Sequence, residues 1–173
     1  VGHSMGAAIV ELMIAMHPVR AAVLVAPVPP TGLVPVATRL AMERPDYLAH
    51  MVSMDPSRLS ADVLHALRPY YFSDDVEPAI LAESVRHLTG ESSRALLDLS
   101  LRLHWLKPER NGIPLMVLGA EGDRISTPAD VRATARHHDV PATILPGLAH
   151  MMMLERAWET VARPIAKWLE ALR

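Results

Sequence analysis

The sequence predicts an α/β fold built on a parallel β-sheet. Three short runs of apolar, partly β-branched residues are flanked by Pro or Gly, and they span residues 21–26, 113–119 and 142–145. Continuous apolar runs of this length are typical of strands covered on both faces. Because helical segments separate them, the strands are expected to run parallel in an α/β arrangement. With 173 residues, half of them hydrophobic, the chain is long enough for one sizeable core.

Helices are predicted before, between and after these strands. Residues 5–17 are almost all apolar and end before a proline, which predicts a helix buried on nearly all sides. Residues 127–138 form the next helix, since Thr127 can cap it and Pro128 suits its first turn. Residues 155–172 carry large apolar side chains at helical spacing, so the chain is expected to end on an amphipathic helix.

The segment 32–111 differs from the rest of the chain. It contains no convincing strand, and its charges are mixed in sign, as on a solvated surface. Helical stretches are predicted within it at residues 61–67, 76–88 and 92–103. We therefore expect an α/β core formed by residues 1–31 and 112–173, interrupted by a helical insertion at 32–111.

Composition excludes several classes of function. The 17 Lys and Arg residues nearly balance 19 Asp and Glu residues, so no electrostatic attraction to nucleic acid or to an anionic membrane is expected. The absence of Cys excludes thiolate catalysis, disulfides and Cys-ligated zinc. No apolar run approaches the roughly 20 residues of a membrane span, and no secretory signal is recognisable. A small-molecule substrate and a cytoplasmic location are the expectations.

Residues 2–6 read Gly-His-Ser-Met-Gly and match G-x-S-x-G, a pattern that places Ser in a strained turn between a strand and a helix. Glycines relieve crowding where the backbone doubles back. The turn would expose Ser4, and the helix that follows would bring the Met5 backbone N–H and a helix N-terminus beside it, where a developing oxyanion could be stabilised. Ser4 is therefore the candidate nucleophile. The alternative is that Ser4 merely caps the helix.

A serine hydroxyl needs a base, and the base needs an acid that fixes its tautomer. Asp123 follows the second predicted strand in a Gly-containing loop, and His150 follows the third. The order Ser, acid, His along the chain fits this type of site. Glu121 is the nearest competing acid, and Asp130 is explained by a place at the start of the following helix. The other histidines lie at helix ends or in the insertion, except His3, which is expected to pack beside the site.

The chain resembles the α/β-hydrolase superfamily, and more narrowly the capped bacterial hydrolases, in its G-H-S-M-G elbow, its G-x-x-G-D acid loop and its G-x-x-H loop. The resemblance extends from residue 2 to residue 172. It implies a serine hydrolase that cleaves a carboxylic ester, thioester or lactone through an acyl-enzyme, with no cofactor and no metal. Residues 32–111 would then be the cap. The triad would equally serve an acyltransferase, a C–C bond hydrolase or a perhydrolase.

Only three residues precede Ser4, whereas the family places several strands before the elbow. We therefore expect a partial fold that lacks the strand entering the elbow and the second oxyanion donor, and a catalytically inert remnant is a competing interpretation. The exposed sheet edge would allow self-association. The methionines at 151–153, together with Met5, suggest either soft apolar walls of a substrate pocket or ordinary core filling. The pocket interpretation implies an apolar small-molecule substrate.

Overall fold

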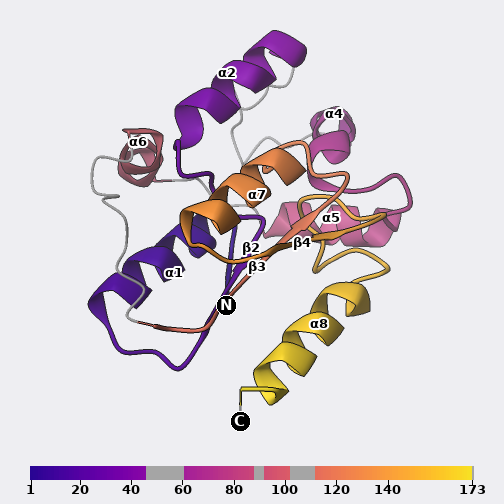
Figure 1. Ribbon diagram of the computed structural model, residues 1–173. Helices are drawn as coiled ribbons and strands as arrows, with labels where there is room; N and C mark the ends of the chain where they lie inside the picture. Colours follow the sequence, from indigo (N-terminus) through magenta and orange to yellow (C-terminus); the bar gives the residue numbers. More distant parts are fainter. Residues whose placement is uncertain (46–60, 88–91, 102–111, 173) are drawn as a thin grey trace.

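The computed structural model describes residues 1–45, 61–87, 92–101 and 112–172, which are arranged around one β-sheet (Figure 1). In this part of the chain the sheet has four strands, all parallel, in the order β1-β2-β3-β4. Their bounds are β1 (Gly2–His3), β2 (Ala22–Val25), β3 (Leu115–Ala120) and β4 (Ala142–Leu145). The predicted α/β class with a parallel sheet is confirmed, and with four strands the fold is a partial one.

The short strand β1 corrects one expectation. Gly2 pairs with Leu24, and His3 pairs with Val25, so a short strand does enter the elbow. A Gly-His pair carries no apolar pattern of its own. These residues become a strand through pairing with β2, which is a long-range cause that the local sequence does not reveal.

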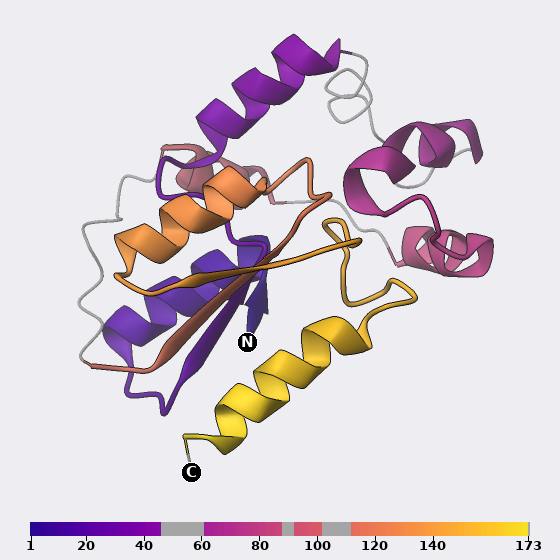
Figure 2. The same cartoon turned by 45° about the vertical axis from the view of Figure 1, so that its right-hand side comes forward.

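Helices cover both faces of the sheet (Figure 2). Helices α1 (Met5–Met16) and α7 (Pro128–His137) pack on one face, and α8 (Glu159–Glu170) packs on the other. Between β2 and β3 the described residues form α2 (Leu33–Glu43), α4 (Ala61–Tyr71), α5 (Pro78–Arg86) and α6 (Ser93–Leu101). None of the described helices is both long enough and apolar enough to cross a bilayer.

Successive core residues along each strand point to opposite faces of the sheet, as the two-residue repeat of a strand requires. Leu24 and Val117 point toward α1 and α7, whereas Val23 and Leu118 point toward α8 and its buried Val161. All four strand residues are almost completely inaccessible. Burial on both faces explains why β2 and β3 read as continuous apolar runs in the sequence.

Helix α1 is less covered than predicted. Its buried residues face the sheet, but a stripe of apolar side chains on its outer surface is between 41% and 72% exposed, and this stripe consists of Ile9, Leu12, Met13 and Met16. The expectation of burial on nearly all sides is therefore wrong. An apolar composition shows that a helix can be buried, but the number of layers packed around the helix decides how much of it is.

The ends of two other helices also have local causes. Thr127 caps α7 as expected, and its side chain and that of Asp130 each accept an amide hydrogen bond from the other residue, which makes a capping box. The C-terminal helix begins at Glu159 rather than at Glu155, because residues 151–156 form turns in which the Glu155 side chain serves as a buried acceptor.

The inserted helices α2 and α4 share a small core of their own, and the α/β part of the chain contributes to it. Val36 and Leu40 of α2 pack with Leu67 and Tyr70 of α4, and Ile125 packs against the same cluster. Because Ile125 lies in the loop that follows β3, the insertion rests directly on that loop. The boundaries 1–31, 32–111 and 112–173 stay a prediction.

Candidate active site

Ser4 occupies a sharp turn between β1 and α1. Its backbone has φ 52° and ψ −119°, a conformation that L residues rarely adopt. The Ser4 amide donates to the carbonyl of Val25 at the end of β2, which fixes the turn at the carboxyl edge of the sheet. A Cβ at Gly2 would lie 2.2 Å from the Gly6 carbonyl oxygen, so glycine is required there. A Cβ at Gly6 would meet no described atom within 4 Å, and only the first of the two glycines is needed for clearance.

Three side chains that the sequence singled out form a hydrogen-bonded chain. The Ser4 hydroxyl donates to Nε2 of His150 over 3.1 Å. Nδ1–H of His150 donates to Oδ2 of Asp123 over 2.8 Å. Because a carboxylate only accepts, this contact assigns the imidazole proton to Nδ1 and leaves Nε2 as the acceptor that faces Ser4. His150 and Asp123 are each only 3% exposed.

The carboxylate of Asp123 is fixed by its second oxygen. Oδ1 accepts hydrogen bonds from the amides of Ile125 (2.8 Å) and Ser126 (2.9 Å). The Ser126 hydroxyl in turn donates to the Pro27 carbonyl, just beyond the end of β2. The loop after β3 is therefore held to the loop after β2, and the Asp123 carboxylate is aimed at His150.

His3 lies beside the candidate base. Its Nε2–H donates to the carbonyl oxygen of His150 over 2.9 Å, and the two ring centroids are 4.8 Å apart. Burial, with a smaller contribution from the positive charge that His150 can carry, lowers the pKa of His3 to about 4. His3 is consequently neutral near pH 7 and acts as a hydrogen-bond donor to the His150 loop, as expected for a residue that packs beside the site.

The helix that follows Ser4 presents its N-terminal end to the site. Met5 is the first residue of α1, and an amide at this position has no acceptor within its own helix. The helix dipole adds partial positive charge at the same place. The Met5 backbone N–H is therefore a candidate oxyanion donor, a role that stays a prediction.

The competing acids have other surroundings. Glu121 is exposed, and Asp130 is occupied by the capping box and by an ion pair with Arg39 at 3.2 Å. Among the histidines, His138 is buried against Glu11 at 2.7 Å, where it joins α7 to α1. His50 and His104 lie outside the described residues.

The methionines after His150 fill the core. Met152 is completely buried and packs with the residues under α8, and Met153 packs against the same cluster. Of the two interpretations of the run at 151–153, core filling holds for these two side chains.

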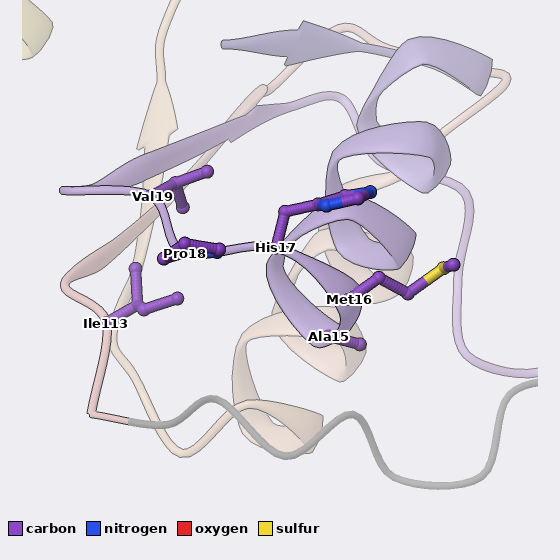
Figure 3. A pocket seen from close by; sticks show the side chains of 6 residues that line it. All are labelled: Ala15, Met16, His17, Pro18, Val19 and Ile113. Carbon is purple, nitrogen blue, oxygen red and sulfur yellow. The ribbon is translucent and has the colours of Figure 1, made fainter.

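A surface depression of about 370 Å³ lies away from these residues (Figure 3). It lies where α1 ends and where the chain enters β2 and β3, and its lining consists of Ala15, Met16, His17, Pro18, Val19 and Ile113. Ser4 and His150 are at the carboxyl ends of the strands, so the depression is at the opposite end of the sheet. It cannot hold a substrate that reacts at Ser4.

Two residues that organise the site were not singled out in the sequence. Glu155 accepts a hydrogen bond from the amide next to His150, and Arg39 donates to the Asp123 loop through the Arg124 and Ile125 carbonyls. Each contacts a partner that is remote in sequence, Arg124 for Arg39 and Ser73 for Glu155, and neither belongs to a local motif.

Comparisons with known proteins place the chain in a family. A family model described as the alpha/beta hydrolase family matches residues 1–163. No match was found among the curated proteins.

Solved structures share the fold. The candidate non-heme bromoperoxidase BpoC of Mycobacterium tuberculosis H37Rv is 21% identical with a TM-score of 0.69, over 99% of this chain and 66% of that one. A thermophilic esterase of Thermogutta terrifontis is 15% identical with a TM-score of 0.68, over 99% and 64%. A soluble variant of monoglyceride lipase from Saccharomyces cerevisiae is 18% identical with a TM-score of 0.63, over 99% and 60%.

This chain therefore spans slightly less than two thirds of the length of each of these structures. At such low identity the likeness establishes the fold alone. The match of the family model, which extends over most of the chain, establishes the family. The protein belongs to the alpha/beta hydrolase family.

Proposed function

We propose that this chain carries the nucleophile, base and acid of a serine hydrolase that cleaves a carboxylic ester, thioester or lactone of an apolar small molecule. The observation that carries the proposal is the hydrogen-bonded chain from Ser4 through His150 to Asp123, built at the carboxyl edge of the sheet on a strained turn.

The reaction would proceed in two halves. His150 Nε2 takes the hydroxyl proton while Ser4 Oγ attacks the substrate carbonyl, and Asp123 stabilises the imidazolium that forms. The Met5 N–H donates to the oxyanion of the tetrahedral intermediate. His150 then gives its proton to the leaving group, which departs as an alcohol or thiol and leaves an acyl group on Ser4. Water, deprotonated by His150, releases the acid and regenerates the serine. No cofactor enters this sequence.

An apolar substrate is supported by one neighbour of the base. The Tyr71 ring lies edge-on to the His150 ring, with centroids 6.0 Å apart, so an aromatic side chain from the insertion borders the reacting atoms. Acyl transfer, C–C bond hydrolysis and perhydrolysis would use the same three residues. An inert remnant is the competing possibility, because a second oxyanion donor is not identified and the loss of one donor costs about 10²–10³ in rate.

A fluorophosphonate probe tests the assignment. We expect covalent labelling at Ser4, mapped by peptide mass spectrometry, and no labelling of Ser4→Ala. The matched control is Ser100→Ala, which changes a serine hydroxyl on α6 that donates to the Leu96 carbonyl and should label as the wild type does. Labelling that survives in Ser4→Ala would show that another residue is the nucleophile.

A series of p-nitrophenyl esters tests the substrate class. If the substrate is apolar, kcat/KM should rise from acetate through butyrate to octanoate. A fall along the series would indicate a small or polar acyl group instead.

A further inference from the structure

Glu155 is a buried carboxylate outside the proposed triad. It is 2% exposed, and its two oxygens accept three hydrogen bonds. Oε1 accepts from the amides of Ala149 (2.9 Å) and Ser73 (3.1 Å), and Oε2 lies 2.6 Å from the Ser73 hydroxyl. A buried carboxylate is costly unless such donors surround it. These contacts join two parts of the chain that are 82 residues apart in sequence.

These contacts involve the backbone on either side of the candidate base, His150. Ala149 precedes His150, and its amide is held by Glu155. Met151 follows His150, and its amide donates to the Tyr71 carbonyl over 2.8 Å. Tyr71 is the last residue of α4, and Ser73 comes just after it. The amides on both sides of His150 are therefore fastened to the end of α4, one directly and the other through the Glu155 carboxylate.

We propose that Glu155 is a positioning residue that sets the place of the His150 imidazole by clamping the His150 loop to residues 71–73. This inference rests on the proposed function, in which Nε2 of His150 must stay within reach of the Ser4 hydroxyl. That contact is 3.1 Å long and joins side chains on two separate loops. Misplacement of a reacting group by about 1 Å can cost 10²-fold in rate, so a loop that carries a base requires fixed anchors.

The two amide hydrogen bonds are the dependable part of the clamp. The Ser73 hydroxyl has one hydrogen and also lies 2.5 Å from Oδ1 of Asp75, so it can donate to only one of the two carboxylates at a time. In Glu155→Gln the side-chain oxygen can still accept both amides, and the new NH₂ group can donate to the Ser73 hydroxyl. Glu155→Ala removes all the hydrogen bonds of the Glu155 carboxylate and leaves the bond between the Met151 amide and the Tyr71 carbonyl. Comparison of the two variants thus separates the effect of losing the hydrogen bonds from the effect of losing the negative charge.

The direct readout is the hydrogen bond between His150 and Asp123. Its proton on Nδ1 should give a downfield proton resonance in NMR spectra of the wild type, identified by its absence from His150→Gln. In Glu155→Ala we expect this resonance to shift or to broaden through faster exchange with water. Glu155→Gln should retain it. The matched control is Glu159→Gln, which alters an exposed glutamate that pairs with Arg163 four residues later and should leave the resonance unchanged.

The second readout is the rate at which a fluorophosphonate modifies Ser4. Glu155→Ala should lower this rate by up to about 10²-fold, and Glu155→Gln should recover most of the loss. Should Glu155→Ala fail to fold, Glu155→Asp, whose carboxylate is one methylene group shorter and is drawn away from both amides, should change both readouts in the same direction by a smaller factor.

The outcomes separate the two proposals. An unchanged resonance and an unchanged labelling rate in a folded Glu155→Ala, or in Glu155→Asp where the first variant does not fold, would overturn the positioning role. A wild type whose Ser4 is not labelled would overturn the proposed function, while the resonance would still report whether Glu155 holds His150 against Asp123.

Discussion

His3 and His150 are joined through the backbone as well as through their rings. Nε2–H of His3 donates to the His150 carbonyl oxygen, and the rings lie 4.8 Å apart at an angle of 52°. The residue immediately before the candidate nucleophile thus holds the loop of the candidate base. This contact needs a proton on Nε2, which the neutral imidazole carries in one of its two tautomers, and burial lowers the pKa of His3 to about 4, so the ring is neutral near pH 7.

The first prediction is that His3 makes the fold sensitive to mild acid. Between pH 6.5 and pH 4 the unfolded chain binds a proton at His3 that the folded chain does not. The free energy of unfolding therefore falls as the pH drops through this window, by up to about 3 kcal/mol from this group. His3→Gln keeps a donor but cannot titrate, so its stability should fall less steeply. Urea denaturation at several pH values measures the slopes, and the exposed His17→Gln is the control. Equal slopes for wild type and His3→Gln would contradict the assignment.

The second prediction distinguishes the two aspartates of the acid loop. Asp123→Asn leaves His150 without an acceptor at Nδ1–H and should lower the rate by up to about 10⁴-fold, as the equivalent change does in a serine protease. Asp130→Asn disturbs the capping box and the ion pair with Arg39, so it should cost about 1 kcal/mol of stability and little rate. Rates of fluorophosphonate labelling at Ser4 and thermal melts of the two variants check this. The reverse pattern would make Asp130 the acid.

The third prediction concerns Arg39, which extends from α2 across the acid loop. Its guanidinium donates to the carbonyls of Arg124 (2.8 Å) and Ile125 (2.9 Å) and to the Asp130 carboxylate (3.2 Å). Arg39→Ala should lower the free energy of unfolding by roughly 1–2 kcal/mol. Arg39→Lys keeps the charge but cannot reach three acceptors as a planar fork does, so it should recover less than half of the loss. Chemical denaturation provides the measurement, and full recovery by lysine would mean that charge alone matters.

The fourth prediction concerns the insertion at 32–111, which the family resemblance implies is a cap. A cap that only roofs a pocket could be deleted with a change of substrate preference and little loss of stability. In the structure Arg39 holds the acid loop, while Tyr71 and Ser73 hold the base loop. Replacing 32–111 by a short linker should therefore lower the melting temperature and strip Glu155 of two donors. A deletion variant that melts like the wild type and only changes its preferred ester would show that the insertion does no more than roof the site.

The fifth prediction is that this chain, expressed as it stands, self-associates and shows at most trace esterase activity. Strand β1 pairs with β2 on one side and is the edge of the described sheet, and the apolar stripe of α1 lies close by on the neighbouring helix. Ile9→Lys and Met13→Glu should each weaken association about tenfold, since burying such a side chain is worth about 1.5–3 kcal/mol.

Light scattering across a concentration series measures this association. Leu97→Glu, at an exposed position on α6, is the matched control. A monomeric wild type that hydrolyses p-nitrophenyl esters at ordinary enzyme rates would contradict the prediction.

The sequence predicted three of the four described strands to within two residues at either end, because continuous apolar runs are a local signal. Strand β1 was not predicted because its two residues acquire their structure by pairing with Leu24 and Val25. The exposed stripe of α1 was missed for a related reason, since a helix of nearly uniform apolarity does not indicate which face meets the sheet.

The residues of the candidate site also divide into those with a local signal in the sequence and those without one. Ser4, Asp123 and His150 could be selected because each follows a predicted strand in a recognisable loop, and the structure brings their side chains together. Glu155 and Arg39 could not be selected. Glu155 looks like the first turn of an amphipathic helix, and its role depends on Ser73, a partner in the insertion. Long-range partners of this kind leave no trace in local spacing.

The register of β2 and β3 bears on how the site is assembled as the protein folds. Leu24 is aligned with Val117 across the whole insertion, whereas Val117 is aligned with Ala142 only about 25 residues later. Closing the longer loop costs roughly 1 kcal/mol more in chain entropy, and contacts of large sequence separation tend to form late. Asp123 and His150, 27 residues apart, should therefore meet early, and Ser4, 146 residues from His150, should join them last. The serine would acquire its base only once the sheet is complete, so the partly folded chain is expected to be unreactive.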